Sequence, residues 1–563
     1  MRFLKNNHLP ILIIFFTSLI IFPLLFFGDL QQDDFYILSL NNLKFKDAFS
    51  TIILQFSNRP IAALIFSLLS RFFNSYEYYI LLNFLLIILS CNFIMKSFQD
   101  YFNTNYIKLI FIFLCIIPIY SYSTLFSSGM QITGNLSVFF WSVSIFFLNK
   151  FIKTELLLNL IISNIILILM FITYESAFPL MVINFFMPIL NKKDSKLKLI
   201  SFFLLLSILF STFLQKIILP EIFNQDISRF RSEGFSFRAF LLYMAANTLL
   251  FFNIFYIFFQ NFFLSLKIIF NSYFLLAQYF LILFFFINLV FINYKKDKEI
   301  KAWKKIKKSQ FFLIIVIYSL LLLFMHAIAK SAMNVYGINN RALVSLSFFI
   351  PLLFVFLFKM INKKKYLIFI VVYFLIIISN YLPIQFNNIN YISERNKSLI
   401  NIIDELNKNS YDEKLFIYLD KVSINELYEH TTFINNNFDF INMIGFKYKK
   451  YFKGDNLWGA NITKDMFCNK SYWNLHYRGQ IIERFEKTKS LIFIEKNNNI
   501  FTFKNFDDLN NFNYFINNKI ICKNKNFYKG YLNKIFNKKS NKDFIIDSKF
   551  IKKNLDLYIK LNQ

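Results

Sequence analysis

Two adjacent aspartates are the strongest chemical feature of the chain. Asp33 and Asp34 follow the first long apolar segment, and Arg59 and Pro60 open another apolar segment 25 residues after Asp34. Carboxylates at a bilayer boundary are costly to desolvate, so this pair is a candidate catalytic site. One aspartate would serve as general base toward a hydroxyl nucleophile, and the other would orient an acceptor or bind a divalent cation such as Mg²⁺ or Mn²⁺. The competing interpretation is a solvated loop after a span.

Three further residues are candidates for substrate binding near the same boundary. Arg59 either snorkels to the interface, pairs with an aspartate of its own loop, or forks onto a phosphate. Tyr174 and Glu175 lie at the junction of two apolar segments. Glu175 is therefore either an interface-anchored hairpin glutamate or an acid that helps to bind an acceptor.

Basic residues in two polar loops complete the candidate set. Arg229, Arg231 and Arg238 lie in and just after one loop, and Lys330 and Arg341 lie in another. Clustered guanidinium and ammonium groups near a bilayer suit a lipid phosphate leaving group, although contact with anionic lipids explains them equally well. Arg341 is the strongest phosphate-binding candidate among them, because it ends a tight polar loop directly before an apolar segment.

The composition indicates a polytopic membrane protein. The chain has 563 residues, of which 56% are hydrophobic, and a mean hydropathy of +0.46. The net charge of +29 is explained by a composition rich in Phe, Lys, Ile and Asn and by basic cytoplasmic loops. A nucleic-acid partner is not expected, because the basic residues form no stripe with interleaved aromatic residues. Neither a GxxxxGK[ST] nor a GxGxxG motif is present, so the sequence shows no motif for binding or hydrolysing a nucleotide.

Apolar run lengths predict eleven membrane spans. The predicted spans are 9–27, 77–95, 107–121, 130–148, 156–173, 175–190, 199–216, one within 249–293, 311–328, 342–359 and 366–383. The first span lacks a small-residue cleavage site and is expected to remain uncleaved. Two apolar segments, 60–74 and 237–250, are predicted to be interfacial or re-entrant helices.

The distribution of lysines predicts the orientation. If the lysine-rich clusters lie in the cytoplasm, then Asp33, Asp34, Tyr174, Glu175 and the C-terminal region all lie on the outer face. We therefore expect a protein of the bacterial inner membrane whose site faces the periplasm.

The chain changes character near Gln385, where apolar runs shorten. We predict a transmembrane domain over 1–384 and a small extracytoplasmic α+β domain over 385–563, with a helix over 393–408, a strand over 415–419 and a hairpin of 491–494 with 500–503. Cys91 and Cys115 lie in apolar spans, whereas Cys468 and Cys522 would be free to pair in an oxidising compartment.

The first hundred residues resemble the GT-C glycosyltransferases, most closely the GtrII-type glucosyltransferases and the protein mannosyltransferase and aminoarabinose transferase relatives. The resemblance rests on one span, a loop with Asp33-Asp34, and the Asn58-Arg59-Pro60 element that opens an apolar segment. It implies a polyprenyl-phosphate-linked sugar donor, a glycan or lipid-linked acceptor, a catalytic acid at Asp33 or Asp34, and juxtamembrane helices that would include 60–74. Carried over by position, Arg59 would be the arginine of the Arg-Pro element, while Tyr174-Glu175 and Arg341 match only loosely. The chain beyond its first hundred residues resembles the family only in architecture.

Two other function classes stay open. An O-antigen polymerase or ligase also combines many spans with arginine-bearing outer loops, but usually has a large loop in mid-chain. A lipid-glycan flippase or transporter would show charges at the bilayer midplane and often a repeated half. Neither feature is visible in this sequence, because its charged residues cluster at the ends of the apolar segments.

Overall fold

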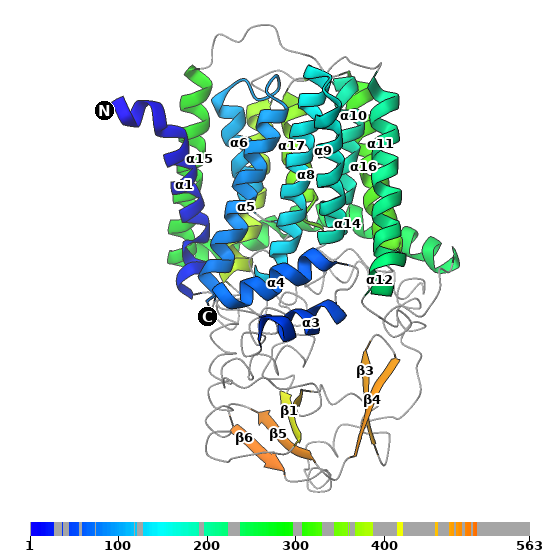
Figure 1. Ribbon diagram of the computed structural model, residues 1–563. Helices are drawn as coiled ribbons and strands as arrows, with labels where there is room; N and C mark the ends of the chain where they lie inside the picture. The colour runs from blue at the N-terminus through cyan, green and yellow to red at the C-terminus, as the bar shows by residue number, and fades with distance from the viewer. Residues whose placement is uncertain are drawn as a thin grey trace. The chain divides into compact units, whose positions relative to one another are not determined.

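The structure is a computed structural model in which helices dominate the first two thirds of the chain (Figure 1). It describes residues 2–27, 37, 44–55, 59–73, 75–117, 119–120, 128–190, 196–222, 237–296, 307–328, 343–358, 360, 366–386, 414–419, 457–459, 472–477, 480–486, 490–496 and 499–503. Contacts divide the chain into two compact units, Met1–Leu30 with Lys44–Asn387 and Gln31–Leu43 with Asn388–Gln563. The described helices belong to the first unit and the described strands to the second.

The helices of the first unit follow the apolar segments of the sequence. Their bounds are α1 Arg2–Phe27, α3 Phe45–Gln55, α4 Pro60–Phe72, α5 Tyr76–Ser97, α6 Asn105–Ile116, α8 Ser128–Thr154, α9 Leu157–Thr173, η2 Glu175–Leu180, α10 Met181–Leu190, α11 Leu197–Phe213, η4 Leu214–Ile218, α12 Leu219–Ile222, α14 Phe237–Asn271, α15 Tyr273–Lys296, α16 Lys308–Ile328 and α17 Leu346–Phe358, followed by a helix over Tyr366–Phe386.

Four helices among the described residues are long and apolar enough to cross a membrane: α5, α8, α16 and the helix Tyr366–Phe386. A fifth candidate is the pair Ser265–Asn271 and Tyr273–Asn288, which bends by 113° between its two parts. Seven other apolar helices have only 10 to 17 residues. At 1.5 Å per residue, a helix of that length spans about 15 to 26 Å, less than a bilayer core. Several helices can therefore cross a membrane, and the count of eleven spans stays a prediction.

Two amphipathic helices differ in direction from the rest of the first unit. Figure 1 shows α3 and α4 lying crosswise at one end of the bundle, whereas α5, α6, α8 and α9 run nearly parallel to one another. On α4, Ala63, Phe66 and Ser70 are buried, while Leu64, Leu68 and Phe72 are exposed along one stripe. The segment 60–74 thus forms a helix across the end of the bundle, an orientation suited to a membrane interface.

The predicted boundary near residue 249 is wrong. The segment 237–250 is not a separate helix, because α14 runs unbroken from Phe237 to Asn271. The sequence between these residues contains neither glycine nor proline, so nothing in it stops the helix. The break comes instead at Ser272, whose Oγ accepts a hydrogen bond from the backbone N–H of Leu275 at 3.5 Å and so caps α15.

Interhelical hydrogen bonds between neutral side chains hold the centre of the bundle. Trp141 of α8 is fully buried and donates from Nε1 to Oδ1 of Asn184 in α10 at 2.9 Å. Asn135 of α8 donates from Nδ2 to Oδ1 of Asn83 in α5 at 2.6 Å. Such bonds satisfy polar groups in an apolar surrounding and also fix the rotation of each helix against its neighbours.

Proline creates a second polar cluster at α1. Pro23 has no N–H to give to the carbonyl of Leu19, and its ring crowds the preceding turn. Gln278 of α15 supplies a donor from Nε2 to the Leu19 carbonyl at 3.3 Å, and Gln385 donates from Nε2 to the Ile20 carbonyl at 2.9 Å. The broken turn is thus satisfied by two buried glutamines from other helices.

The second unit contains six described strands: β1 Lys414–Leu419, β2 Leu457–Gly459, β3 Tyr472–Tyr477, β4 Gln480–Glu486, β5 Ser490–Lys496 and β6 Asn499–Phe503. Four form a sheet in the order β2-β1-β5-β6, in which β1 is parallel to both β2 and β5, while β3 and β4 form an antiparallel pair. The predicted strand over 415–419 is confirmed, as is the predicted hairpin, because β5 and β6 pair antiparallel with Ile494 opposite Phe501. The predicted helix over 393–408 and both C-terminal cysteines lie outside the described residues.

Candidate functional site

The structure describes three of the nine predicted site residues and brings all three together. Arg59, Tyr174 and Glu175 meet in one cluster, although Arg59 and Glu175 are 116 positions apart in the chain. The other six lie outside the described residues: Asp33, Asp34, Arg229, Arg231, Lys330 and Arg341. Arg238 lies in the first turn of α14.

Arg59 is positioned by the start of α4. It is the N-cap residue, with φ −137° and ψ 62°, and its carbonyl accepts the first helical hydrogen bond from Ala63 N at 3.1 Å. Pro60 follows at the first helical position, where its fixed φ suits the helix and its missing N–H costs nothing. The chain therefore turns sharply at Arg59, and its side chain leaves the helix at the end of the bundle.

Tyr174 and Glu175 are positioned by the end of α9. The helix stops at Thr173, Tyr174 is extended with φ −165° and ψ 126°, and a 3-10 helix begins at Glu175. Pro179 lies inside this 3-10 helix. An α-helix cannot run through that segment without a clash between the proline ring and the carbonyl of Glu175. The sequence thus forces the helix to break before Pro179, and the resulting 3-10 segment begins at Glu175.

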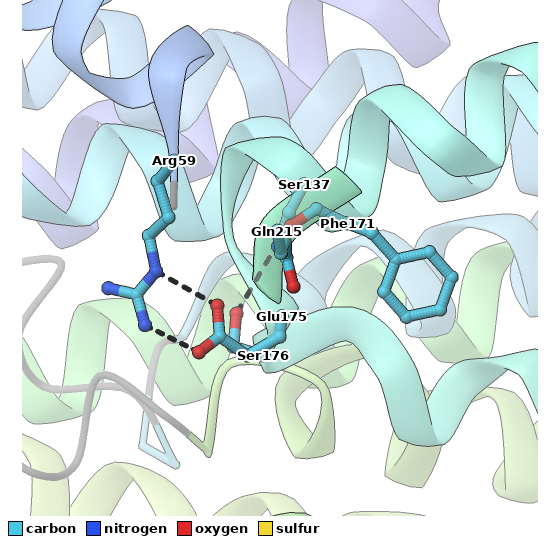
Figure 2. Close-up of polar contacts among 6 residues, drawn as sticks. All are labelled: Arg59, Ser137, Phe171, Glu175, Ser176 and Gln215. Atoms are coloured by element: carbon cyan, nitrogen blue, oxygen red, sulfur yellow. Dashed lines mark hydrogen bonds and ion pairs between the residues drawn. The ribbon is translucent and has the colours of Figure 1, made fainter. Parts of the chain in front are cut away.

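The Arg59 guanidinium and the Glu175 carboxylate form a forked ion pair (Figure 2). Arg59 Nε donates to Oε2 at 2.9 Å and Nη2 donates to Oε1 at 2.5 Å. The Arg59 Cζ atom lies 4.6 Å from the centroid of the Tyr174 ring. The side chains are only 17% and 31% exposed, so the pair is partly removed from solvent. This two-point, ring-backed geometry requires arginine, since lysine offers no planar fork.

Arg59 is a permanent cation in this setting. Burial acts to lower its pKa, but attraction to the Glu175 carboxylate, the hydrogen bonds to it and the neighbouring Tyr174 together prevail. The pKa of Arg59 is therefore raised above its ordinary value. Two of the five guanidinium N–H groups bond to Glu175. The Nη1 edge points away from the carboxylate in Figure 2, and among the described residues no hydrogen bond from Nη1 is seen.

Two further polar contacts lie at the junction between α9 and η2. Gln215 donates from Nε2 to the backbone carbonyl of Phe171 at 2.6 Å, and the hydroxyls of Ser137 and Ser176 lie 3.5 Å apart. Figure 2 shows these groups beside the Glu175 side chain. Sequence reasoning missed all three residues. None carried a distinguishing signal, because Gln215 stands beside Lys216 at the polar end of an apolar run and serines recur throughout the apolar segments.

A second ion pair marks the opposite end of α9. Lys196 Nζ lies 2.6 Å from Oε1 of Glu155, just before α9 begins. The 17 residues of α9 separate the two pairs by about 26 Å. Lys96, Lys150 and Lys153 lie in the last turns of helices α5 and α8, which end on the Lys196 side. These four lysines thus lie at one end of the bundle and the Arg59–Glu175 pair lies at the other.

A metal site is not visible in the described part of the chain. No group of three or more His, Cys, Asp or Glu side chains there is close enough to hold an ion. Asp33 and Asp34, the candidate ligands, lie outside that part, so the divalent cation stays a prediction.

No protein-family model, curated protein sequence or solved structure matches this chain. What the fold itself defines is a mostly helical protein with several helices able to cross a membrane.

Proposed function

We propose that the chain is a GT-C-like glycosyltransferase of the bacterial inner membrane. It would move a sugar from a polyprenyl-phosphate donor to a hydroxyl of a lipid-linked or surface glycan on the periplasmic face. In this proposal residues 1–384 form the transmembrane catalytic domain, with eleven spans and with α3 and α4 as juxtamembrane helices. Residues 385–563 form an extracytoplasmic α+β domain.

The observation that carries the proposal is the Arg59–Glu175–Tyr174 cluster. Charged groups at the end of an apolar bundle are expensive to desolvate and are retained mainly where they serve a site. The crosswise α4, which Arg59 caps, matches the juxtamembrane helix that the family resemblance implies.

The charge distribution supports the proposed orientation. Lys96, Lys150, Lys153 and Lys196 lie at one end of the bundle, and basic residues favour the cytoplasmic side. The Arg59 end would then face the periplasm, where polyprenyl-phosphate sugars need no nucleotide because their phosphate ester already activates the sugar.

The proposed reaction is a displacement at the anomeric carbon of the sugar. The acceptor oxygen forms a bond to that carbon while the bond from carbon to phosphate oxygen breaks, and its electron pair stays on the departing lipid phosphate. Asp34 or Asp33 takes the proton of the acceptor hydroxyl. Arg341, with Lys330 or Arg229 and Arg231, would stabilise the charge that develops on the phosphate. A divalent cation on the aspartates would add to that stabilisation.

Arg59 has a distinct role in this scheme. Glu175 neutralises its charge and fixes its plane, while Tyr174 backs the guanidinium. The remaining Nη1 edge offers donors of fixed direction to a donor phosphate or an acceptor hydroxyl. A preorganised donor of this kind costs no side-chain ordering when the substrate arrives.

The test compares surface glycans by mass spectrometry in cells that carry the intact protein, no protein, Asp33→Asn/Asp34→Asn, or Glu175→Gln. Ser211→Ala serves as control, because Ser211 is buried and its hydroxyl has no hydrogen-bond partner among the residues that the structure describes. We expect one sugar substituent to disappear in the first three altered strains and to persist in the control.

Two results would contradict the proposal. Unchanged glycans in the strain without the protein would exclude a glycan role. A loss only in that strain, with full transfer by the aspartate variant, would move the chemistry away from the first loop and favour a polymerase, ligase or flippase.

A further inference from the structure

The carbonyl of Phe171 lies where α9 stops and the chain turns toward Arg59. In a continuing α-helix this carbonyl would accept the N–H of Glu175, four residues later. The helix instead ends at Thr173, and Tyr174 is extended. The carbonyl is part-buried and would lack a donor without outside help, at a cost typical of an unsatisfied polar group.

Gln215 provides that help. It lies in the π-helical turn η4, Leu214–Ile218, which continues α11, and it donates from Nε2 to the Phe171 carbonyl at 2.6 Å. Single π turns in otherwise α-helical segments frequently accompany functional sites. The amide of Gln215 therefore takes the place that the N–H of Glu175 would hold in a longer α9.

We propose that Gln215 is a positioning residue that keeps Glu175 out of helix α9 and turned toward Arg59. Removal of the amide leaves the Phe171 carbonyl to recapture the Glu175 N–H. That bond lengthens α9 through Tyr174. Each residue added to a helix rotates by about 100°, so the Glu175 carboxylate would swing away from the guanidinium. Pro179 does not prevent this step, because the recaptured bond lies N-terminal to it.

A simpler role for Gln215 would be to fasten α11 to α9. The same two helices already share another hydrogen bond, from Ser207 Oγ to Oδ1 of Asn164 at 2.7 Å, two turns deeper in the bundle. The variant Ser207→Ala removes that fastening without touching the junction. It is therefore the matched control for Gln215→Leu, which keeps the approximate size of the side chain and removes its donor.

The experiment measures how fast an arginine-selective dicarbonyl reagent, phenylglyoxal, modifies Arg59 in the purified full-length protein in nanodiscs, read by peptide mass spectrometry. The reagent attacks the neutral guanidine, and the ion pair with Glu175 both keeps the guanidinium protonated and engages two of its nitrogen atoms. Release of Arg59 from Glu175 should therefore raise the modification rate. We expect this rise in Gln215→Leu and in Glu175→Gln, no further rise when both changes are combined, and the wild-type rate in Ser207→Ala.

Either of two results overturns the inference. One is a wild-type rate in Gln215→Leu while Glu175→Gln is fast, and the other is an equal rise in Ser207→Ala. If Gln215→Leu does not fold, Gln215→Asn replaces it. The shorter amide should give an intermediate rate, and a wild-type rate would again contradict the inference.

The role in catalysis rests on the proposed function, whereas the labelling test does not. In cells, Gln215→Leu should reduce sugar transfer as Glu175→Gln does. Coupled labelling with unchanged glycans in every variant, including Asp33→Asn/Asp34→Asn, would refute the proposed function and leave the positioning intact. Full transfer by Gln215→Leu, with loss in Glu175→Gln, would refute the positioning role.

Discussion

The Arg59–Glu175 pair should contribute measurably to stability, and the geometry sets its size. Exposed pairs are worth about 0 to 1 kcal/mol, whereas removing one partner of a buried pair costs about 3 to 5 kcal/mol. The two side chains are 17% and 31% exposed and meet through two hydrogen bonds, so the pair falls between these limits. We expect Glu175→Gln and Arg59→Met each to lower the free energy of unfolding by about 2 kcal/mol.

A double-mutant cycle isolates the interaction from other effects of each change. Once either partner is gone, loss of the second should cost little, so the double variant should lose about 2 to 3 kcal/mol in place of about 4. Unfolding of the purified protein in mixed micelles with increasing SDS, followed by tryptophan fluorescence, gives the four free energies. The coupling energy should therefore be about 1 to 2 kcal/mol.

A second ion pair in the same protein provides the control. Lys196–Glu155 has a similar separation, but Glu155 is 64% exposed. Its coupling in the cycle Glu155→Gln with Lys196→Met should stay below about 0.5 kcal/mol. Equal coupling in the two cycles, or none in the Arg59 cycle, would refute the argument that partial burial and the forked geometry strengthen the Arg59 pair.

The pH dependence of the coupling has a defined sign. The pKa of Arg59 is raised in the folded protein, so its contribution is fully present below the ordinary arginine pKa and is lost only as pH rises through the higher folded value. The coupling should therefore be equal at pH 7 and pH 9. A decline between these values would contradict the assignment of a permanent cation.

Two further predictions concern topology and packing. A reporter fused at Lys193 should behave as cytoplasmic and one fused at Asn401 as external, and the reverse would refute the orientation derived from the lysines. Gln385→Leu should lower the free energy of unfolding by about 0.5 to 1.5 kcal/mol, because it removes the 2.9 Å donor to the Ile20 carbonyl and leaves only the Tyr381 hydroxyl at 3.4 Å. An unchanged unfolding curve would show that water or another donor satisfies that carbonyl.

The sequence predicted helices and strands well where one hydrophobic periodicity, or one proline or turn, determines where the element begins or ends. The helix that follows Arg59-Pro60, the strand over 415–419 and the hairpin of β5 with β6 were all foreseen. The boundary inside 237–293 was not, because a long apolar run without glycine or proline contains no mark of where one helix ends. The helix breaks at Ser272, whose side chain caps α15, and a single serine in an apolar run does not predict such a cap.

The site shows a different limit. Residue types at a predicted membrane boundary were enough to select Arg59, Tyr174 and Glu175 as candidates, since charges are rare there. The pairing of Arg59 with Glu175 could not be predicted, because it depends on α4 lying across the end of α9, a contact between segments 116 positions apart. The contact of Gln215 could not be predicted for the same reason, since it is made with a carbonyl in another helix.

The contrast between the two ends of α9 bears on which end performs chemistry. At the Lys196 end, the ammonium meets a mostly exposed carboxylate, lies 5.4 Å from the centroid of the Phe151 ring and lies 3.4 Å from the carbonyl of Ile152, which is the ordinary way to cap a helix. At the Arg59 end, a planar guanidinium is fixed by two hydrogen bonds, and the carboxylate is held by a junction that includes Pro179 and Gln215. Capping requires neither the fork nor the junction. A preorganised cation held in a fixed plane is what a site for anionic or hydroxyl ligands requires.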